Sequence, residues 1–411
     1  MYDSHRMRLS DFITGVAFKQ IVQVDIPDGG SNQHEFNGTR ALCQFFGAPQ
    51  NVIGSDFRVE GRIDWHYFPE NGEVVSGSSR FTFYDARAKS ANRTGRSEWR
   101  LYYYGDFLNH ARAGDALILI RTTSNRVIGL VMQQGSGWLR AARTLFGIHP
   151  RNSSMMSIPR TILDAGVIGF AERRILEQLG VDYILPEQAG DREIVSVEFG
   201  DEFPATYKMS DLARKLAETD FRDPDTTLLR WIEREEQLFR ALESIVVERQ
   251  IKTGFASVEQ FIAYSLSVQN RRKSRMGFSL ENHLGALFKA QGIRFEAGRT
   301  TEGKNRPDFL FPSQRAYLDP TFPSSALTML AAKSTCKERW RQILTEAKRI
   351  DEKHLLTLDQ GISSEQLDEM ENQRVKVVIP GPLHVSYPDQ RARLLTLADF
   401  ISLVRRKEKI M

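Results

Sequence analysis

The chain has 411 residues, of which 41% are hydrophobic and 26% are charged, so it is long enough for two or three folded domains and too apolar for a disordered protein. Its two cysteines exclude a disulfide framework and a cysteine-built zinc site, and a net charge of +4 decides little until the charges are located. No apolar run approaches the roughly 20 residues that cross a bilayer, and the polar N-terminus has no signal-peptide core, so we expect a cytoplasmic protein.

The first part of the chain is typical of a β-rich domain. Short runs of Val, Ile, Phe and Tyr are separated by turn residues. The run 116–132 predicts a hairpin with Ser124 and Asn125 near its turn. We therefore expect a small sheet or barrel over residues 1–175 and a linker over the mixed, polar residues 176–205.

Basic residues gather in three runs, at 85–100, 270–275 and 333–349. Taken singly, each run is more simply explained as a charged surface that faces solvent. Three of them in a chain of modest net charge favour a polyanion as the binding partner.

Residues 206–411 begin with helical periodicity and continue as a mixed α/β pattern. Apolar residues recur at helical spacing from Leu280 to Phe288 and predict a helix with Ser279 as its N-cap and Gly292 as its stop. Glu281 would then lie in the first turn of this helix.

Two short strands follow. Pro307 and Pro312 bound an apolar run that predicts a strand with Asp308 at its entrance. Residues 327–332 predict a buried strand that ends in Lys333, a residue that must point out of a core element.

An amphipathic helix is predicted next, because apolar residues recur at helical spacing from Trp340 to Ile350. Arg339, Gln342 and Glu346 would project together from its other side.

Asp308, Lys333 and Glu346 are the residue types that metal-assisted hydrolysis of a phosphodiester needs. Carboxylate oxygens can hold Mg²⁺, and a lysine can orient a water and stabilise charge on phosphorus. The simpler alternative is that Asp308 caps a turn and that Lys333 is a surface lysine at the end of a strand.

Several blocks in the second half resemble one nuclease family. RRKSRMGFSLE, TEGKNRPDFLFPSQRAYLD, AAKSTCKERWRQILTEAKRI and VVIPGPLHVSYP occur in the order found in the catalytic domain of the EcoRII restriction endonuclease family, from about residue 225 to 405. The resemblance implies a PD-(D/E)XK endonuclease domain over 206–411, an α/β fold with a mixed central sheet flanked by helices. The NQHEFNG loop and the AGDALILI segment are similar to the family's N-terminal DNA-binding pseudobarrel.

The resemblance implies that Asp308 and Glu346 bind Mg²⁺ and that Lys333 is the catalytic lysine. The superfamily usually has an acid two residues before this lysine, where this chain has Ala331. EcoRII-like enzymes place that acid on the following helix instead. The family also has a tyrosine that resembles Tyr317 near the active site.

A glutamate that resembles Glu281 completes the implied catalytic set. Related enzymes read CC and GG steps with a triplet that resembles Lys337, Glu338 and Arg339, because Lys or Arg donates to guanine and Glu accepts from cytosine. This implies a target such as CCNGG or CCWGG. The alternative is an ordinary charged helix end.

Further DNA contacts are expected on two basic segments and one loop. Trp99 is more simply part of a strand core. The full set of expected contacts outside the triplet is Arg271, Arg272, Arg93, Arg96, Trp99 and His34.

The resemblance as a whole predicts a Mg²⁺-dependent type II restriction endonuclease that cuts double-stranded DNA as a homodimer. Its N-terminal domain would regulate or supplement the cut, and a DNA cytosine methyltransferase would be its genetic partner. Two alternatives stay open: a sequence-specific DNA-binding regulator on an inactive nuclease scaffold, and a modification-dependent endonuclease. We expect no membrane partner and no nucleotide cofactor.

Overall fold

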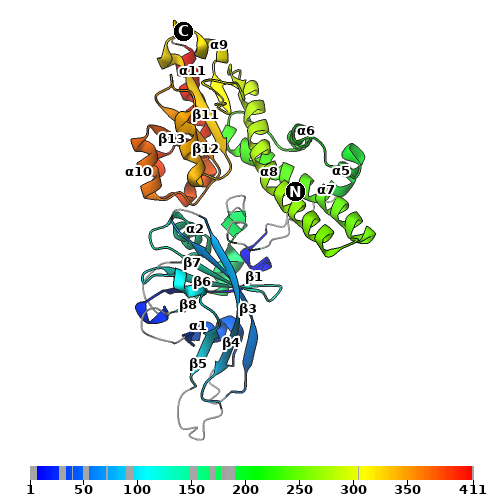
Figure 1. Ribbon diagram of the computed structural model, residues 1–411, viewed down its shortest axis with the longest axis vertical. Helices are drawn as coiled ribbons and strands as arrows, with labels where there is room; N and C mark the ends of the chain where they lie inside the picture. The colour runs from blue at the N-terminus through cyan, green and yellow to red at the C-terminus, as the bar shows by residue number, and fades with distance from the viewer. Residues whose placement is uncertain are drawn as a thin grey trace. The chain divides into compact units, whose positions relative to one another are not determined.

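The chain divides into two compact units in a computed structural model (Figure 1). The first comprises Met1–Tyr183 with Gln360–Ser363, and the second comprises Ile184–Asp359 with Ser364–Met411. The structure describes residues 7–26, 34–38, 40–49, 55–70, 73–88, 97–148, 155–166, 168, 172–173, 175–176, 179, 181, 190–303 and 305–409, without the side chains of 273 and 337–339.

The first unit is built on an eight-stranded sheet with the order β2-β5-β4-β3-β7-β6-β1-β8, which confirms the expected β-rich domain. Neighbouring strands are antiparallel except β3 and β7, which run parallel. The strands are β1 (Ile13–Gln20), β2 (Glu35–Gly38), β3 (Arg58–Phe68), β4 (Val75–Asp85), β5 (Trp99–Tyr103), β6 (Ala116–Thr122), β7 (Val127–Met132) and β8 (Met156–Ser157). The helical segments are η1 (Leu9–Asp11), η2 (Gln23–Asp25), α1 (Arg40–Phe46), η4 (Phe107–His110), α2 (Gly137–Phe146) and α3 (Arg160–Ala165).

Both faces of the central strands are buried. On β6, Ile118 belongs to the apolar cluster that contains α2, and its neighbour Leu119 belongs to the cluster that contains α1. The predicted hairpin is confirmed, since β6 and β7 pair through a turn at which Asn125 adopts a left-handed φ of 62°. Asparagine tolerates this conformation better than most residues.

The second unit combines a helical layer with a five-stranded mixed sheet of order β13-β12-β11-β10-β9 (Figure 1). Its helices are α5 (Asp191–Phe199), α6 (Thr206–Leu216), α7 (Pro224–Thr253), α8 (Val258–Ala290), α9 (Gln314–Leu318), α10 (Ser364–Asn372) and α11 (Leu397–Glu408). Its strands are β9 (Glu296–Ala297), β10 (Phe309–Phe311), β11 (Thr328–Lys333), β12 (Lys353–Thr357) and β13 (Val375–Val378), and its 3-10 segments are η5 (Ser324–Ala326), η6 (Lys337–Thr345), η7 (Gly381–Ser386) and η8 (Arg391–Arg393). This is the mixed sheet flanked by helices that was expected.

The expected linker over 176–205 contains a packed helix. Helix α5 places Val195 in an apolar cluster with Leu238 and Leu242 of α7. Arg234 of α7 also forms a buried ion pair with Asp191 of α5, with 2.7 Å between Nη2 and Oδ1. Helix α5 is therefore part of the second unit.

Helix α8 is longer than predicted. Ser257 caps its start, so Ser279 and Glu281 lie far inside one helix instead of at the beginning of another. Ion pairs to α7 hold the basic stretch in helical form, because Arg272 pairs with Glu243 and Arg275 with Glu235. Gly292, with a φ of 70°, follows the helix end as predicted.

The predicted helix over residues 340–350 is wrong in type and in extent. Its apolar residues are buried as expected, but the segment forms η6, a 3-10 helix that ends at Thr345. Glu346 follows with extended backbone, and Ala347 takes a left-handed φ of 46°. Local turn geometry, which apolar spacing does not encode, therefore positions Glu346.

One buried carboxylate ties the long helices to the end of the chain. Asp225, in the first turn of α7, accepts backbone N–H groups from Gly381, Leu397 and Ala398 at 2.8–3.0 Å. Within the part of the chain that the structure describes, no helix is both long and apolar enough to span a bilayer.

Candidate active site

Antiparallel pairing of β10 with β11 brings Asp308 to Lys333. The register opposes Phe309 to Leu330, so Asp308, which precedes β10, lies beside the end of β11. Asp308 Oδ2 accepts the Ala332 N–H at 2.7 Å and the Lys333 ammonium at 2.9 Å. The predicted pair is therefore brought together.

This pair is accessible from solvent. The side chains of Lys333 and Asp308 keep 25% and 15% of their surface exposed, although Ala331 and Ala332 beside them are buried. Because Lys333 and Asp308 are both partly exposed, a ligand from solvent can contact them.

Two further carboxyl groups, those of Glu281 and Glu346, interact electrostatically with Asp308 and Lys333. Burial, reinforced by the negative charge of Asp308 and opposed by Lys333, raises the pKa of Glu281 to about 7. Burial and Asp308 likewise raise the pKa of Glu346 to about 7, against Lys333 and Lys353. Four of the five predicted catalytic residues thus share one electrostatic site, although they come from α8, the entrance of β10, β11 and the turn after η6.

The donor set fits a hard divalent cation. Asp308 contacts Lys333, and burial followed by the negative charge of Asp308 raises the pKa values of Glu281 and Glu346, an effect that a bound cation would oppose. Among the described residues, no group of three or more acidic, histidine or cysteine side chains is arranged to hold a metal by itself. Mg²⁺ needs less than this, because it commonly keeps several waters and binds through one or two carboxylates and a substrate phosphate.

Tyr317 is buried beside the loop that carries Glu346. Its hydroxyl donates to Glu302 and accepts the Arg349 N–H at 3.3 Å. Burial, followed by the hydrogen bond to Glu302, raises the pKa of the Tyr317 hydroxyl to about 12. Among the described residues, the Tyr317 hydroxyl hydrogen-bonds to Glu302 and to the backbone of Arg349, and not to Asp308 or Lys333.

Two groups that the sequence did not single out lie in the same region. Glu302 holds Tyr317, and the buried Lys353 donates to the Ile350 carbonyl at 2.8 Å. The charge of Lys353 also acts on Glu346. A lysine at a strand start gives no sequence signal of this kind.

The predicted DNA contacts have mixed outcomes. Arg93 and Arg96 lie outside the described residues, as do the side chains of the triplet at 337–339. Trp99 is 8% exposed and stacks on Phe83 at 5.2 Å between ring centroids, which argues against a DNA contact, and that contact stays a prediction. His34 lies edge-on to Tyr103 at 5.6 Å and stays a prediction.

Arg271 and Arg272 each contact another side chain of the same unit, although Arg272 stays exposed. Arg271 lies 4.0 Å from the ring centroid of Phe203, and Arg272 Nε donates to Glu243 Oε2 at 2.8 Å. The DNA contacts predicted for them stay predictions, and these partners argue against them.

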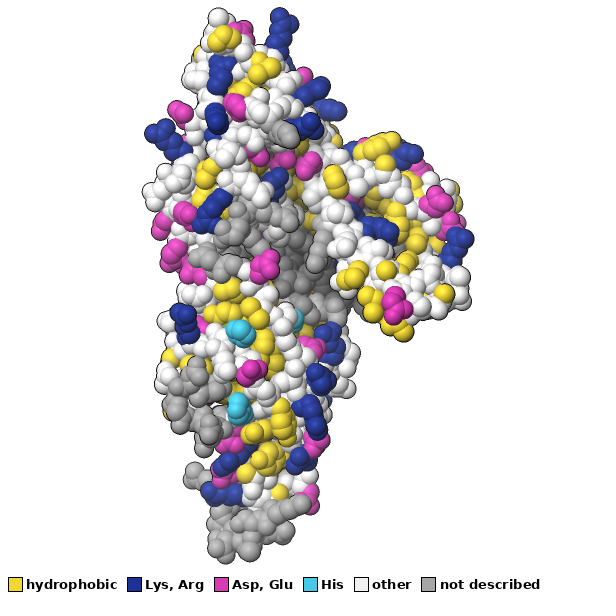
Figure 2. Space-filling model, viewed as in Figure 1, with side chains coloured by type: hydrophobic (Ala, Val, Ile, Leu, Met, Phe, Trp, Pro, Cys, Tyr) yellow, Lys and Arg dark blue, Asp and Glu magenta, His cyan; other side chains and the backbone are white. Residues whose placement is uncertain are grey.

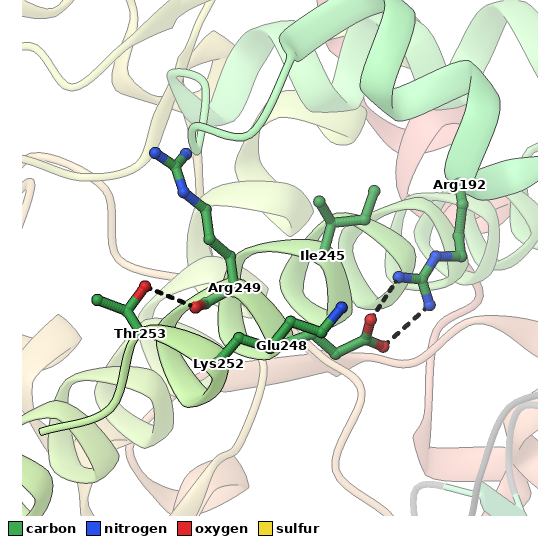
Figure 3. A pocket seen from close by; sticks show the side chains of 6 residues that line it. All are labelled: Arg192, Ile245, Glu248, Arg249, Lys252 and Thr253. Atoms are coloured by element: carbon green, nitrogen blue, oxygen red, sulfur yellow. Dashed lines mark hydrogen bonds and ion pairs between the residues drawn. The ribbon is translucent and has the colours of Figure 1, made fainter.

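An open pocket of about 430 Å³ lies elsewhere in the second unit, between α5 and α7 (Figure 3). Arg192 and Glu248 close one side with a two-pronged ion pair at 2.8–3.0 Å. Its lining contains none of the four site residues; it consists of Arg192, Ile245, Glu248, Arg249, Lys252 and Thr253. We assign it no role in the chemistry.

Comparison with known proteins points to the same half of the chain. The family described as EcoRII C terminal matches residues 239–401, a range that contains all four site residues. This match spans about two fifths of the chain. The type II restriction enzyme EcoRII of Escherichia coli is 45% identical over 222 residues. That match covers 54% of this chain and 52% of EcoRII, so the chain spans about half the length of this relative.

Solved structures also resemble the chain. Metal-depleted Ecl18kI in complex with uncleaved, modified DNA is 20% identical, with a TM-score of 0.45, over 54% of this chain and 85% of that chain. The PspGI restriction endonuclease in complex with substrate DNA is 18% identical, with a TM-score of 0.41, over 55% of this chain and 95% of that chain.

The raised pKa of Glu346 predicts that the site destabilises the metal-free fold. A folded-state pKa of about 7 against an ordinary 4.5 means that the folded protein binds the proton more tightly, so stability is lost as pH rises through 7. In EDTA at pH 8, Glu346→Gln should therefore raise Tm by a few degrees, about 1–2 kcal/mol after allowance for solvent screening, and should change little at pH 4.5.

The exposed Glu202 supplies the control, because Glu202→Gln should leave Tm unchanged at both pH values. A lower Tm for Glu346→Gln at pH 8 would show that burial and Asp308 do not oppose the ionisation of Glu346.

Proposed function

We propose that this protein is a Mg²⁺-dependent type II restriction endonuclease that hydrolyses double-stranded DNA. The observation that carries the proposal is the contact of Lys333 with Asp308, flanked by Glu281 and Glu346, inside the segment that matches the EcoRII C-terminal family. The similarity to EcoRII supports it.

In this proposal Asp308 and Glu346 hold the metal. Bound Mg²⁺ would neutralise the scissile phosphate and lower the pKa of a water. The Ala332 N–H orients the Asp308 carboxylate, and the Lys333 ammonium is released from Asp308 to stabilise charge on the phosphate. Glu281, partly protonated near neutral pH, can hold or release a proton beside the same group.

The proposed target is a short G·C-flanked site such as CCNGG or CCWGG. Lys337, Glu338 and Arg339 open η6, the element that follows β11 directly. A Lys-Glu-Arg triplet matches the acceptors of guanine and the donor of cytosine in the major groove. A DNA cytosine methyltransferase that protects such sites in the host is the genetic partner that this function requires.

A double-strand cut with one active site per strand implies a homodimer. The first half of α8 supports this proposal, because it leaves Val258, Phe261, Ile262 and Leu266 between 51% and 68% exposed at helical spacing. Apolar stripes of this kind on a soluble domain commonly mark a contact with another protein.

The N-terminal unit is proposed to bind a further stretch of DNA and to regulate the cut. Figure 2 shows Lys and Arg side chains down one edge of this unit, and on its sheet Arg62 of β3 lies directly opposite Arg80 of β4. Arg62 donates to Ser78 at 3.1 Å, and Arg80 lies over the half-exposed ring of Tyr104. Among the described residues, neither arginine forms an ion pair with a carboxylate at 4.0 Å or less.

Like charges directly opposite each other on a sheet repel. A phosphate between Arg62 and Arg80 would relieve this repulsion and gain two charge-assisted hydrogen bonds. This pair supports the proposal that the sheet face meets a DNA backbone.

Loss of the catalytic pair should abolish cleavage and leave binding intact. Asp308→Ala and Lys333→Ala should each reduce the cleavage rate at least 1000-fold, because both groups act on the reacting phosphate. Plasmid digestion in Mg²⁺ measures the cut, and gel-shift titration in EDTA measures binding. Undiminished cutting by both variants would refute the site.

Loss of the cross-strand arginine pair should weaken binding without changing sequence preference. Arg62→Ala with Arg80→Ala should reduce the slope of log K against log salt by about 1–2, because each phosphate contact contributes about 0.9. Arg192→Ala, which breaks an ion pair in the other unit, is the control. An unchanged slope in the double variant would remove this face from the DNA contact.

A further inference from the structure

We propose that Glu302 is a positioning residue: with Tyr317 it clamps the turn that carries Glu346 and so sets where that carboxylate meets Asp308. This inference rests on the proposed nuclease function. It assigns a role to a glutamate that stands outside the four residues of the site.

The turn needs a clamp because no regular element holds it. Glu346 has extended backbone directly after η6, Ala347 has a left-handed φ of 46°, and β12 begins only at Lys353. A non-glycine residue at positive φ is strained and persists only where surrounding contacts hold it.

Some of those contacts come from Glu302 and its immediate surroundings. Glu302 Oε1 accepts the Lys348 N–H at 3.1 Å and the Tyr317 hydroxyl, which in turn accepts the Arg349 N–H. On the other side of Glu346, Asn305 Nδ2 donates to the Thr345 carbonyl at 2.8 Å. Backbone groups before and after Glu346 are thus fixed from one short loop.

A lysine fixes the far end of the turn. The buried Lys353 donates to the Ile350 carbonyl at 2.8 Å. Its charge acts on Asp351, Glu302 and Glu346 together, so it singles out no pair of these acids. The positioning role of Glu302 therefore rests on the hydrogen bonds that its oxygen accepts.

Even a small displacement of the turn should have a large effect on the cleavage rate. A shift of about 1 Å in a group that holds the reacting phosphate can reduce a rate by about 100-fold. Removal of the Glu302 carboxylate leaves two donors without an acceptor, the Lys348 N–H and the Tyr317 hydroxyl, so the turn loses its fixed geometry.

The decisive variants are Glu302→Ala, which removes the acceptor, and Glu302→Gln, which keeps an oxygen acceptor. Tyr317→Phe breaks the clamp from its other side. Asp399→Ala is the matched control, because Asp399 also accepts a hydroxyl and a backbone N–H, those of Thr396 at the start of α11.

Two readouts separate positioning from general loss of structure. The first is the single-turnover cleavage rate at saturating Mg²⁺, with DNA binding in EDTA measured in parallel. The second is amide hydrogen exchange of residues 346–350 in the metal-free protein, which reports the turn without any catalysis.

Glu302→Ala and Tyr317→Phe should cut at least tenfold more slowly, bind DNA normally and speed amide exchange in 346–350. Glu302→Gln should stay within about threefold of the natural protein, and Asp399→Ala should match it in both readouts. Normal cleavage by Glu302→Ala would overturn the positioning role, as would unchanged exchange. An inactive natural protein in which Glu302→Ala still speeds exchange would refute the nuclease function and leave the clamp standing.

Discussion

The contact between Asp308 and the end of β11 is the constraint on which the site depends. Two donors, the Ala332 N–H and the Lys333 ammonium, meet one carboxylate oxygen. Only the antiparallel register of β10 and β11 permits this, and Phe288 of α8 fixes β10 by packing on Phe309 and Phe311. A shift by one residue would turn every side chain of β10 to the other face. The position of Asp308 is thus a property of the core.

The acidic groups around this contact are not fully neutralised by basic side chains. Glu281 and Glu346 approach Asp308 from a helix and a turn, and both have pKa values near 7 because burial and Asp308 oppose their ionisation. Lys333 and Lys353 oppose this effect only in part, since both pKa values stay raised. A divalent cation and a phosphate would complete the charge balance, so the same arrangement that weakens the metal-free protein favours its ligand. The arrangement proposed to bind the metal therefore lowers the stability of the metal-free protein.

Much of the fold around the site could be predicted from the sequence, because strong local patterns indicate its strands. The bounded apolar run after Asp308 and the apolar strand before Lys333 led to the correct strands and the correct pair. The errors have two causes, since tertiary contacts overrode the apolar pattern in one segment and local turn geometry overrode it in another. Ion pairs to α7 extended α8 through Ser279, and turn geometry removed Glu346 from the predicted helix. Glu302 carried no signal, since its role arises from contacts with Tyr317 and Lys348 that are distant in sequence.

The central claim is that Asp308, Lys333 and Glu346 converge on one divalent ion beside a scissile phosphate. Anomalous diffraction from Mn²⁺, in crystals of the Lys333→Ala variant with a DNA duplex that contains the target, tests this claim most directly. The account predicts an anomalous peak bound by carboxylate oxygens of Asp308 and Glu346, next to a phosphate of the duplex. A peak held by other side chains, or ordered DNA with no metal at these two acids, would contradict it.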